Sequence, residues 1–321
     1  MIKNAIHLFI FAFIINPVFA QEIAKTQEGR NVVLWIDGTW TYTDSSALTR
    51  ILPQNIPNLQ LSAVTNQEVI VHHTGFSLLY NEPHEQASWV AYELSSDKAA
   101  KGAERAGQFK LDPKVATGTA NDRDYAGSGY DRGHLAPAAD MTWSDTAMAE
   151  SFYYNNMSPQ LPGFNRGVWK RLEQLVRNWA GLYDTIYIAT GPVLQDNLPS
   201  IGPNQVSVPA YFYKVILDYK APSVKGIGFI LAHGSSTDPL EKFAVTIDSV
   251  QQLTGIDFFS ALPDDQERII ESSLCLPCWS WRKPPVTTAF VQCKGLTQSG
   301  LRCTRKTTNP NGYCHQHDPG R

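Results

Sequence analysis

Cysteine is missing from the first 274 residues of this 321-residue chain, and all five cysteines follow that point. Disulfide bonds therefore cannot hold the larger part of the chain together, so it must fold around a hydrophobic core. Long apolar runs are also missing after residue 20, whereas a membrane-spanning helix needs roughly 20 apolar residues. We expect a chain with no membrane segment beyond its N-terminus, and with a separate appendage that carries the cysteines.

The first 20 residues have the pattern of a signal peptide. Lys3 is followed by apolar residues 5–15, interrupted only by His7, and then by a small-residue cleavage motif at residues 18–20. An uncleaved anchor is the alternative. The residue directly after the cleavage point is Gln21 and not a cysteine, which argues against a lipoprotein. The pattern predicts an exported protein that is secreted or periplasmic.

Strand and helix patterns are mixed along the chain rather than strictly alternating, which predicts the α+β class. Strands are expected at residues 68–71, 76–80, 89–94, 185–189, 211–217 and 226–231. Helices are expected at residues 145–154, 166–180, 249–254 and 264–273. Residues 21–65 form an N-terminal segment with no assigned role, in which residues 32–35 resemble a strand that ends at the Asp37-Gly38 turn.

The tetrapeptide Asp131-Arg132-Gly133-His134 combines a cation, a permissive glycine and a titratable base. Cleavage of a phosphodiester needs these chemical groups, because an arginine can bind the phosphate and a histidine can take a proton from water. Taken alone, such a short string more often marks a surface histidine. Asp140, six residues beyond His134, is expected in a turn or in a hydrogen bond rather than at a metal.

A second chemical pattern lies on the helix predicted at residues 166–180. Apolar residues at 168, 172, 175, 176 and 179 form one stripe, which is typical of a helix packed on a core. The opposite face carries Arg166, Lys170, Glu173 and Arg177, and Asn165 lies where an N-cap is expected. For an isolated helix, a solvated face with charge pairs is the simpler interpretation.

Five runs in order identify a resemblance: DRGHLAPAADM, SFYYNNMSPQ, FNRGVWKRLE, YIATGPV and TGIDFFSALPDD. Together they resemble the DNA/RNA non-specific endonucleases, the ββα-metal or His-Me finger nucleases. The resemblance covers residues 66–274, and five ordered motifs are far more specific than any one of them. It implies a ββα-metal fold for this region, and we expect a small Cys/His-rich module after it on the separate pattern of the tail cysteines.

The resemblance also implies roles for individual residues. His134 matches the general base that activates water, and Asn165 matches the single protein ligand of Mg²⁺ or another divalent cation such as Mn²⁺. Glu173 matches a carboxylate that orders water around the metal. Arg132 and Arg177 match arginines that contact phosphate. Further matches are Asn156, which helps position the site, and Arg105, a further phosphate-binding arginine.

The function implied is an exported, Mg²⁺-dependent endonuclease that hydrolyses DNA and RNA with little sequence specificity and leaves 5′-phosphates. A binding protein on a decayed nuclease scaffold is one alternative, although His134, Asn165 and Glu173 are all retained. A phosphodiesterase for a smaller diester is the other. Oligomeric state has no signature in the sequence.

Proline and cysteine mark a boundary near residue 275, and residues 275–290 are predicted to be a linker. The tail from residue 281 holds seven lysines and arginines against one aspartate, a formal charge of +6. Because the whole chain carries −3, the remainder carries −9. An acidic body needs a local basic face to bind a polyanion, and the tail could assist it.

The tail cysteines have the spacing of a small metal-binding module at residues 291–318. Cys293, Cys303, Cys314 and His317 could form a Cys₃His zinc site, with His315 as an alternative fourth ligand. Disulfides are the competing interpretation in an exported chain, but five cysteines cannot all pair. Cys275 and Cys278 could form a small disulfide or remain reduced.

Overall fold

The computed structural model describes residues 22–25, 31–34, 40–42, 51, 53–100, 107–221, 224–281, 291–297, 300–307, 313–314 and 316–317. The proposed signal peptide, Asp37-Gly38, Arg105 and His315 lie outside these residues. The chain divides into two compact units, residues 1–281 and residues 282–321.

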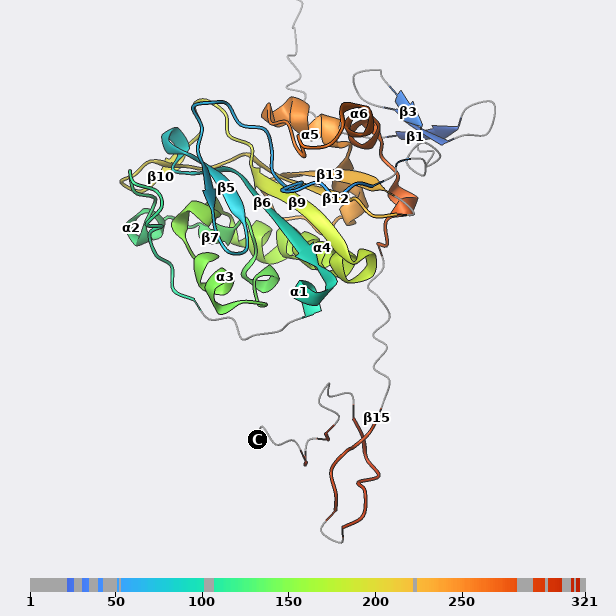
Figure 1. Ribbon diagram of the computed structural model, residues 1–321. Coiled ribbons are helices and arrows are strands. Elements are labelled where there is room, and N and C mark those ends of the chain that lie inside the picture. The colour runs from blue at the N-terminus through green and yellow to red at the C-terminus, as the bar shows by residue number, and fades with distance from the viewer. Residues whose placement is uncertain are drawn as a thin grey trace, which may run out of the picture. The chain divides into compact units, whose positions relative to one another are not determined.

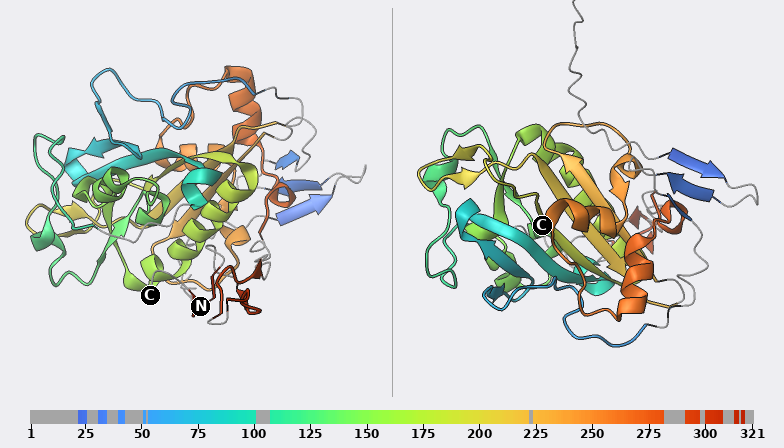
Figure 2. Two further views of the ribbon diagram at one scale, coloured as in Figure 1. Left: turned by 60° about the horizontal axis from the view of Figure 1, so that its bottom comes forward. Right: turned by 90° about the horizontal axis from the view of Figure 1, so that it is seen from above.

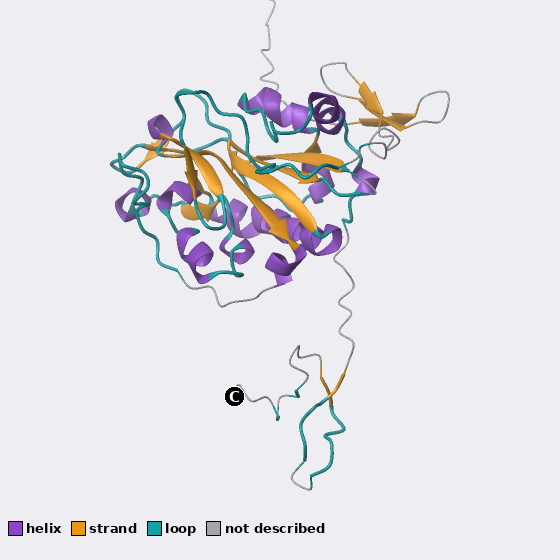
Figure 3. Ribbon diagram, viewed as in Figure 1, coloured by secondary structure: helices purple, strands orange, loops and turns teal. Residues whose placement is uncertain are grey.

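A seven-stranded sheet organises the first unit (Figures 1 and 3). Its order is β14 (Ala244–Val245), β13 (Lys225–Ala232), β12 (Tyr211–Asp218), β9 (Thr185–Pro192), β6 (Gln86–Ser95), β5 (Ser77–Asn81) and β4 (Ile70–His72). Every pairing between these neighbours is antiparallel. The mixture of this sheet with helices confirms the predicted α+β class.

Helices cover both faces of the sheet (Figures 1 and 2). Helices α1 (Ser96–Ala100), α3 (Asp145–Glu150) and α4 (Lys170–Tyr183) lie on one side, and α5 (Ile247–Thr254) and α6 (Asp264–Ser272) on the other. Side chains alternate along a strand, so β6 sends Val90 and Tyr92 into the core under α4 and Trp89 into the core under α5. The central strands are therefore apolar on both faces.

Helix α4 buries the stripe that its sequence predicts. Leu172, Leu175, Val176, Trp179 and Ala180 are all buried against the sheet. The helix begins differently, however, because a π-helical turn, Phe164–Trp169, precedes it and Gly167 has non-helical backbone angles. A kink at Gly167 therefore separates the predicted helix into two parts.

Two short strands that the sequence analysis did not predict lie directly before this helix. Strand β7 (Asp131–His134) pairs antiparallel with β8 (Met157–Gln160). Gly133 is required by packing rather than by its permissive backbone, because a Cβ atom there would lie 2.2 Å from the Gln160 side chain. Strands β7 and β8 with α4 form the ββα unit of a ββα-metal fold.

The helix predicted at residues 145–154 was wrong in its second half, since α3 ends at Glu150. The next residues instead bond to a distant segment: the Lys110 amide donates to the Phe152 carbonyl, and the Tyr154 amide donates to the Lys110 carbonyl. A 3-10 turn, Tyr154–Asn156, then leads into β8. Long-range backbone bonds thus override the local helical pattern.

The remaining elements are short. They are α2 (Asp122–Tyr125), the hairpin of β10 (Ser200–Ile201) and β11 (Val206–Ser207), and 3-10 turns at Glu82–His84, Ala138–Asp140, Leu240–Phe243 and Leu276–Cys278. A separate antiparallel sheet contains β1 (Glu22–Lys25), β2 (Asn31–Leu34) and β3 (Trp40–Tyr42). Strand β2 overlaps the strand predicted at residues 32–35.

Residues on both sides of the predicted nuclease region, 66–274, pack into its core. At the front, Ile51 and Leu59 are buried in the core under α5 and α6. At the end, Trp279 packs on Trp179 with ring centroids 4.4 Å apart, so residues 275–281 belong to the body and not to a linker. Cys275 and Cys278 form a disulfide there. Residues 282–290 lie outside the described residues.

Within the described part of the chain, none of the helices has the length and apolar character needed to cross a bilayer.

Candidate active site

A cavity of about 440 Å³ brings together five of the seven residues that the nuclease resemblance singled out. Arg132 and His134 reach it from β7, Asn165 from the π-helical turn, and Glu173 and Arg177 from α4. The wall also contains Pro137, Ala138, Ala139, Thr142, Met148, Arg166 and Lys170. The polar helix face predicted from sequence therefore faces a cavity rather than open solvent.

His134 lies at the end of β7 with only 9% of its surface exposed. The Phe152 ring meets the imidazole edge-on, with centroids 5.0 Å apart and planes at 88°. Phe109 lies 5.9 Å away on centroids. These two rings restrict the imidazole to a narrow range of orientations, as a general base requires.

Asn165 does not cap a helix, so that prediction was wrong. Gly163 takes the N-cap position, and the Asn165 amide already bonds to the Leu161 carbonyl. The side-chain nitrogen of Asn165 instead donates to Asp131 Oδ2 at 2.9 Å. That bond directs the other side-chain atom, Oδ1, away from Asp131, which makes it the atom available to a metal.

Asp131 holds two residues of the cavity wall. Besides Asn165, it accepts from Arg166 Nε at 2.8 Å and Arg166 Nη2 at 2.6 Å. Burial raises the pKa of the Asp131 carboxyl, but the hydrogen bonds from Arg166 and Asn165 outweigh burial and lower it below the ordinary value. Asp131 therefore stays ionised and acts as an orienting acceptor, a role that the sequence analysis missed.

Arg132 is held in place by two aromatic side chains and a carboxylate. Its Nε donates to the Tyr154 hydroxyl at 3.1 Å, and its Nη2 donates to Asp122 Oδ1 at 2.7 Å. The guanidinium lies 5.1 Å above the Phe109 ring, where a cation–π contact adds to the hold. Arg132 is thus fixed at the cavity before any anion arrives.

Arg177 is fixed in a comparable way by Asp140. Arg177 Nη1 donates to Asp140 Oδ1 at 2.5 Å, and the Tyr92 hydroxyl donates to Asp140 Oδ2 at 2.8 Å. Asp140 is only 1% exposed, so this ion pair is shielded from solvent. The prediction that Asp140 is a hydrogen-bonding residue is confirmed.

Asn156 does not reach the cavity wall. It is fully buried, its Nδ2 donates to the carbonyls of Ala136 and Ser151, and its Oδ1 accepts from the Ala136 amide. These bonds pin the backbone two residues after His134. Asn156 is therefore a positioning residue, and it does not contact the cavity itself.

The oxygen donors of the cavity fit a hard divalent cation. Asn165 Oδ1 and the Glu173 carboxylate are the kinds of ligand that Mg²⁺ and Mn²⁺ prefer, and Mg²⁺ commonly keeps several waters beside one or two protein oxygens. Among the described residues, no group of three His, Cys or carboxylate side chains that could hold a metal involves this cavity. Such a sparse set of protein oxygens fits a cation that keeps most of its waters.

The tail brings its four predicted ligands together. Ligand atoms of Cys293, Cys303, Cys314 and His317 all lie within 4.8 Å of one another, and the three thiols are buried and unbridged. His317 Nδ1 is 3.5 Å from Cys293 Sγ and 3.4 Å from Cys314 Sγ. A tetrahedral zinc with ordinary bond lengths requires an S···N edge of about 3.6 Å. The cluster can therefore hold a metal ion.

The cysteine environment also suits a thiolate. Cys293 Sγ accepts from the backbone amides of Cys314 at 3.2 Å and Gly295 at 3.3 Å. Burial raises the pKa of the Cys293 thiol, but these amides and His317 lower it more, to about 6. The thiolate is the form of cysteine that binds metal, so a thiol that ionises readily suits a metal site.

The remaining histidines that the structure describes in the body have structural contacts. His73 bonds to Asp112 at 2.8 Å, and His72 bonds to Ser77 at 2.9 Å, so the two do not form a metal pair. His84 bonds to Ser207, and His233 bonds to the Pro209 carbonyl.

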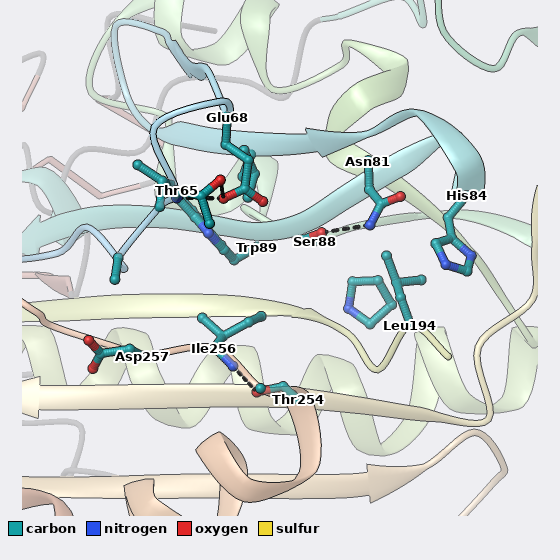
Figure 4. A pocket seen from close by; sticks show the side chains of 15 residues that line it. Thr65, Glu68, Asn81, His84, Ser88, Trp89, Leu194, Thr254, Ile256 and Asp257 are labelled. Atoms are coloured by element: carbon teal, nitrogen blue, oxygen red, sulfur yellow. Dashed lines mark hydrogen bonds between the residues drawn. The ribbon is translucent and has the colours of Figure 1, made fainter. Parts of the chain in front are cut away.

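A second cavity of about 440 Å³ lies on the other side of the sheet (Figure 4). Its wall includes Trp89, Asn81 and His84 from the strand region, and the segment from Thr254 to Asp257 that follows α5. None of the residues predicted for catalysis lines this cavity.

Residues 55–265 match the DNA/RNA non-specific endonuclease family, and the chain belongs to that family. The fold and the cavity have the ββα-metal arrangement expected of that family. Residues 291–320 match a domain of unknown function, DUF5763.

Individual relatives agree with this assignment. The chain is 34% identical to the mitochondrial nuclease EXOG of Danio rerio over 60% of this chain and 62% of that protein. It is 33% identical to the mitochondrial endonuclease G of Homo sapiens over 57% of this chain and 67% of that protein. A chain in the crystal structure of the EndoG/EndoGI complex superposes with a TM-score of 0.58 at 32% identity, covering 61% of this chain and 88% of that one.

Proposed function

We propose that this protein is an exported, divalent-metal-dependent endonuclease that hydrolyses phosphodiester bonds in DNA and RNA and leaves 5′-phosphates. The observation that carries the proposal is the single cavity that gathers His134, Asn165 and Glu173 with two fixed arginines. The chain spans 62% of the length of the Danio rerio relative.

In this proposal the protein's side chains transfer a proton and hold positive charge beside the phosphate. His134 takes a proton from the attacking water, since an imidazole that is neutral near pH 7 can accept one. Arg132 and Arg177 bind the non-bridging phosphate oxygens, and their guanidinium groups need no rearrangement because Asp122 and Asp140 already hold them. Preorganised charge of this kind stabilises the developing negative charge on the phosphate.

Asn165 would hold the cation and Glu173 would order the water around it, and the cation would supply positive charge beside the scissile phosphate and the leaving oxygen. All of these contacts address the phosphate backbone. Contacts to phosphate position a nucleic acid without reading its bases, so little sequence specificity is expected. Contacts of this kind are compatible with both DNA and RNA.

The tail is proposed to be a zinc module that uses Cys293, Cys303, Cys314 and His317. Its support is the set of edge lengths and thiolate-stabilising amides described above. So few residues cannot bury a stable core without a metal or another cross-link. Export is proposed from the N-terminal pattern of residues 1–20.

The proposal is tested by incubating the purified mature protein with supercoiled plasmid and with RNA, with Mg²⁺, with Mn²⁺ and with a chelator. Both substrates should be cut in the presence of metal and should stay intact with chelator. Intact substrates under every divalent metal would reject the proposal. A salt-dependent complex without cleavage would instead support a binding protein.

His134→Ala tests the assignment of the base. Its turnover should fall by a factor of about 100 to 10,000 while its melting temperature stays near that of the wild type. His72→Ala is the matched control, because His72 is exposed and its imidazole bonds to the nearby Ser77. Equal activity of His134→Ala and His72→Ala would remove His134 as the base.

A further inference from the structure

A group of carboxylates lies on the side of the sheet opposite to the catalytic cavity. Asp257 follows α5, and Glu267 and Glu271 lie one turn apart on one face of α6. One oxygen from each of the three lies within 4.8 Å of the others. Figure 1 shows α5 and α6 side by side above the sheet, while α4, which carries Glu173 and Arg177, lies below it.

No positive side chain balances this group within the described parts of the chain. None of the ion pairs there involves Asp257, Glu267 or Glu271. Asp248 and Asp264 add further negative charge nearby. A cation placed among the three carboxylates would balance their charge.

A second and independent observation is an unsatisfied oxygen inside the group. Glu271 is only 4% exposed, and its Oε2 accepts from Gln251 Nε2 at 2.9 Å. Its Oε1 is buried and has no hydrogen-bond partner among the described residues, and the same is true of Glu267 Oε1. A buried anionic oxygen without a partner is strongly destabilising. Two such atoms from one cluster indicate a missing ligand.

Carboxylate oxygens on a partly open site are the ligands of a hard cation with a flexible coordination shell. Ca²⁺ accepts six to eight oxygens, including carboxylates and waters, whereas Mg²⁺ requires a stricter octahedral arrangement. Asp257 is exposed, so water can reach the group from that side and complete the shell. The Asp257 carbonyl also accepts from the Ala63 amide at 2.8 Å, which anchors the segment.

We propose that Asp257, Glu267 and Glu271 bind a Ca²⁺ ion that links α6 to the segment after α5. The ion is structural and separate from the catalytic metal. It neutralises the carboxylates and coordinates the unsatisfied oxygens, so it stabilises the packing of α6 on the sheet. The site needs no residue of the catalytic cavity.

The test uses the full mature chain with Asn165→Ala, which removes the proposed ligand of the catalytic metal. Calorimetric titration with CaCl₂ should give one binding event, and the melting temperature should rise with Ca²⁺ because the ion binds only the folded state. Glu271→Gln and Asp257→Asn in the same background should weaken binding by more than about tenfold. Asp265→Asn, an exposed position on the same helix, is the matched control and should bind as the parent does.

Stability provides a readout that does not depend on calorimetry. In calcium-free buffer, Glu271→Gln should melt above the parent, because it removes a buried charge and keeps an acceptor for Gln251. In saturating Ca²⁺ the order should reverse. A higher melting temperature for Glu271→Gln in both buffers overturns the site, as does the absence of Ca²⁺ binding. In that case, protons shared among the carboxylates supply the missing positive charge.

Discussion

Replacing Asp131 by alanine tests whether this carboxylate orients Asn165, the proposed metal ligand. Asp131 accepts the Asn165 amide at 2.9 Å and is only 17% exposed in its side chain. A hydrogen bond to a charged group contributes about 1.5–3 kcal/mol. Without it, the Asn165 amide can rotate, and its Oδ1 no longer faces the cation in one fixed direction.

The expected loss follows from that energy. Since about 1.4 kcal/mol corresponds to a factor of ten, the bond accounts for roughly 10- to 100-fold in metal affinity. This range agrees with the usual effect of removing a group that orients a metal ligand. Because Asp131 touches neither water nor phosphate in the proposed reaction, the rate at saturating metal should remain close to that of the wild type.

The assay is the initial rate of plasmid nicking as a function of Mg²⁺ concentration. Asp131→Ala should need about 10 to 100 times more Mg²⁺ for half-maximal rate and should recover at high Mg²⁺. Arg166→Ala is the control, because it removes the other partner of Asp131 and leaves the Asn165 bond in place. Arg166 is 72% exposed, so its ion pair contributes little by itself.

Two results would refute this reasoning. One is an Asp131→Ala enzyme with the Mg²⁺ response of the wild type. The other is a loss of rate that no Mg²⁺ concentration restores, which would give Asp131 a direct part in the reaction.

Three further predictions concern other parts of the chain. Lys214 is fully buried, its Nζ lies 4.9 Å above the Trp169 ring without a hydrogen-bond partner among the described residues, and burial lowers its pKa to about 8. Between about pH 8 and 10 the unfolded chain binds more protons at this lysine than the folded chain does. In denaturant titrations, the free energy of unfolding of the wild type should therefore rise with pH relative to that of Lys214→Met. Equal pH dependence of the two proteins would contradict this. Deleting residues 282–321 should leave the rate at saturating substrate unchanged. It should weaken DNA binding and flatten the salt dependence of that binding, because seven basic residues are lost. A truncated protein without activity would show that the tail belongs to the active domain. Metal analysis of the protein should find one zinc for the tail that is lost in Cys314→Ser, whereas thiol titration showing paired cysteines and no zinc would exclude the module.

Local patterns predicted α4 well, because the burial of a helix face depends on spacing that is written in one stretch of sequence. The apolar positions at Leu172, Leu175, Val176 and Trp179 are buried as expected. The polar face could be predicted for the same reason. Whether this face borders open solvent or a cavity depends on β7, which lies more than 30 residues earlier in the chain.

The sequence did not predict contacts that join distant residues through side chains or short strands. Strands β7 and β8 are too short to show a period of their own, and each exists because the other pairs with it. Asparagine is a residue type that often caps a helix, but the helical turn begins before Asn165. Asp131 accepts a hydrogen bond from the side-chain amide of Asn165 instead. Local propensity was overridden in both cases by a partner elsewhere in the chain.

The amino-acid sequence by itself determined the chemical groups of this protein: a histidine, an asparagine, a glutamate and arginines in a fixed order, and a tail with metal-binding spacing. Tertiary structure alone decided which carboxylates hold those groups, with Asp131 on Asn165, Asp140 on Arg177 and Asp122 on Arg132. It also brought Asp257 near Glu267 and Glu271. The physical reason is that charge interactions and hydrogen bonds depend on distance in space, which separation along the chain does not specify.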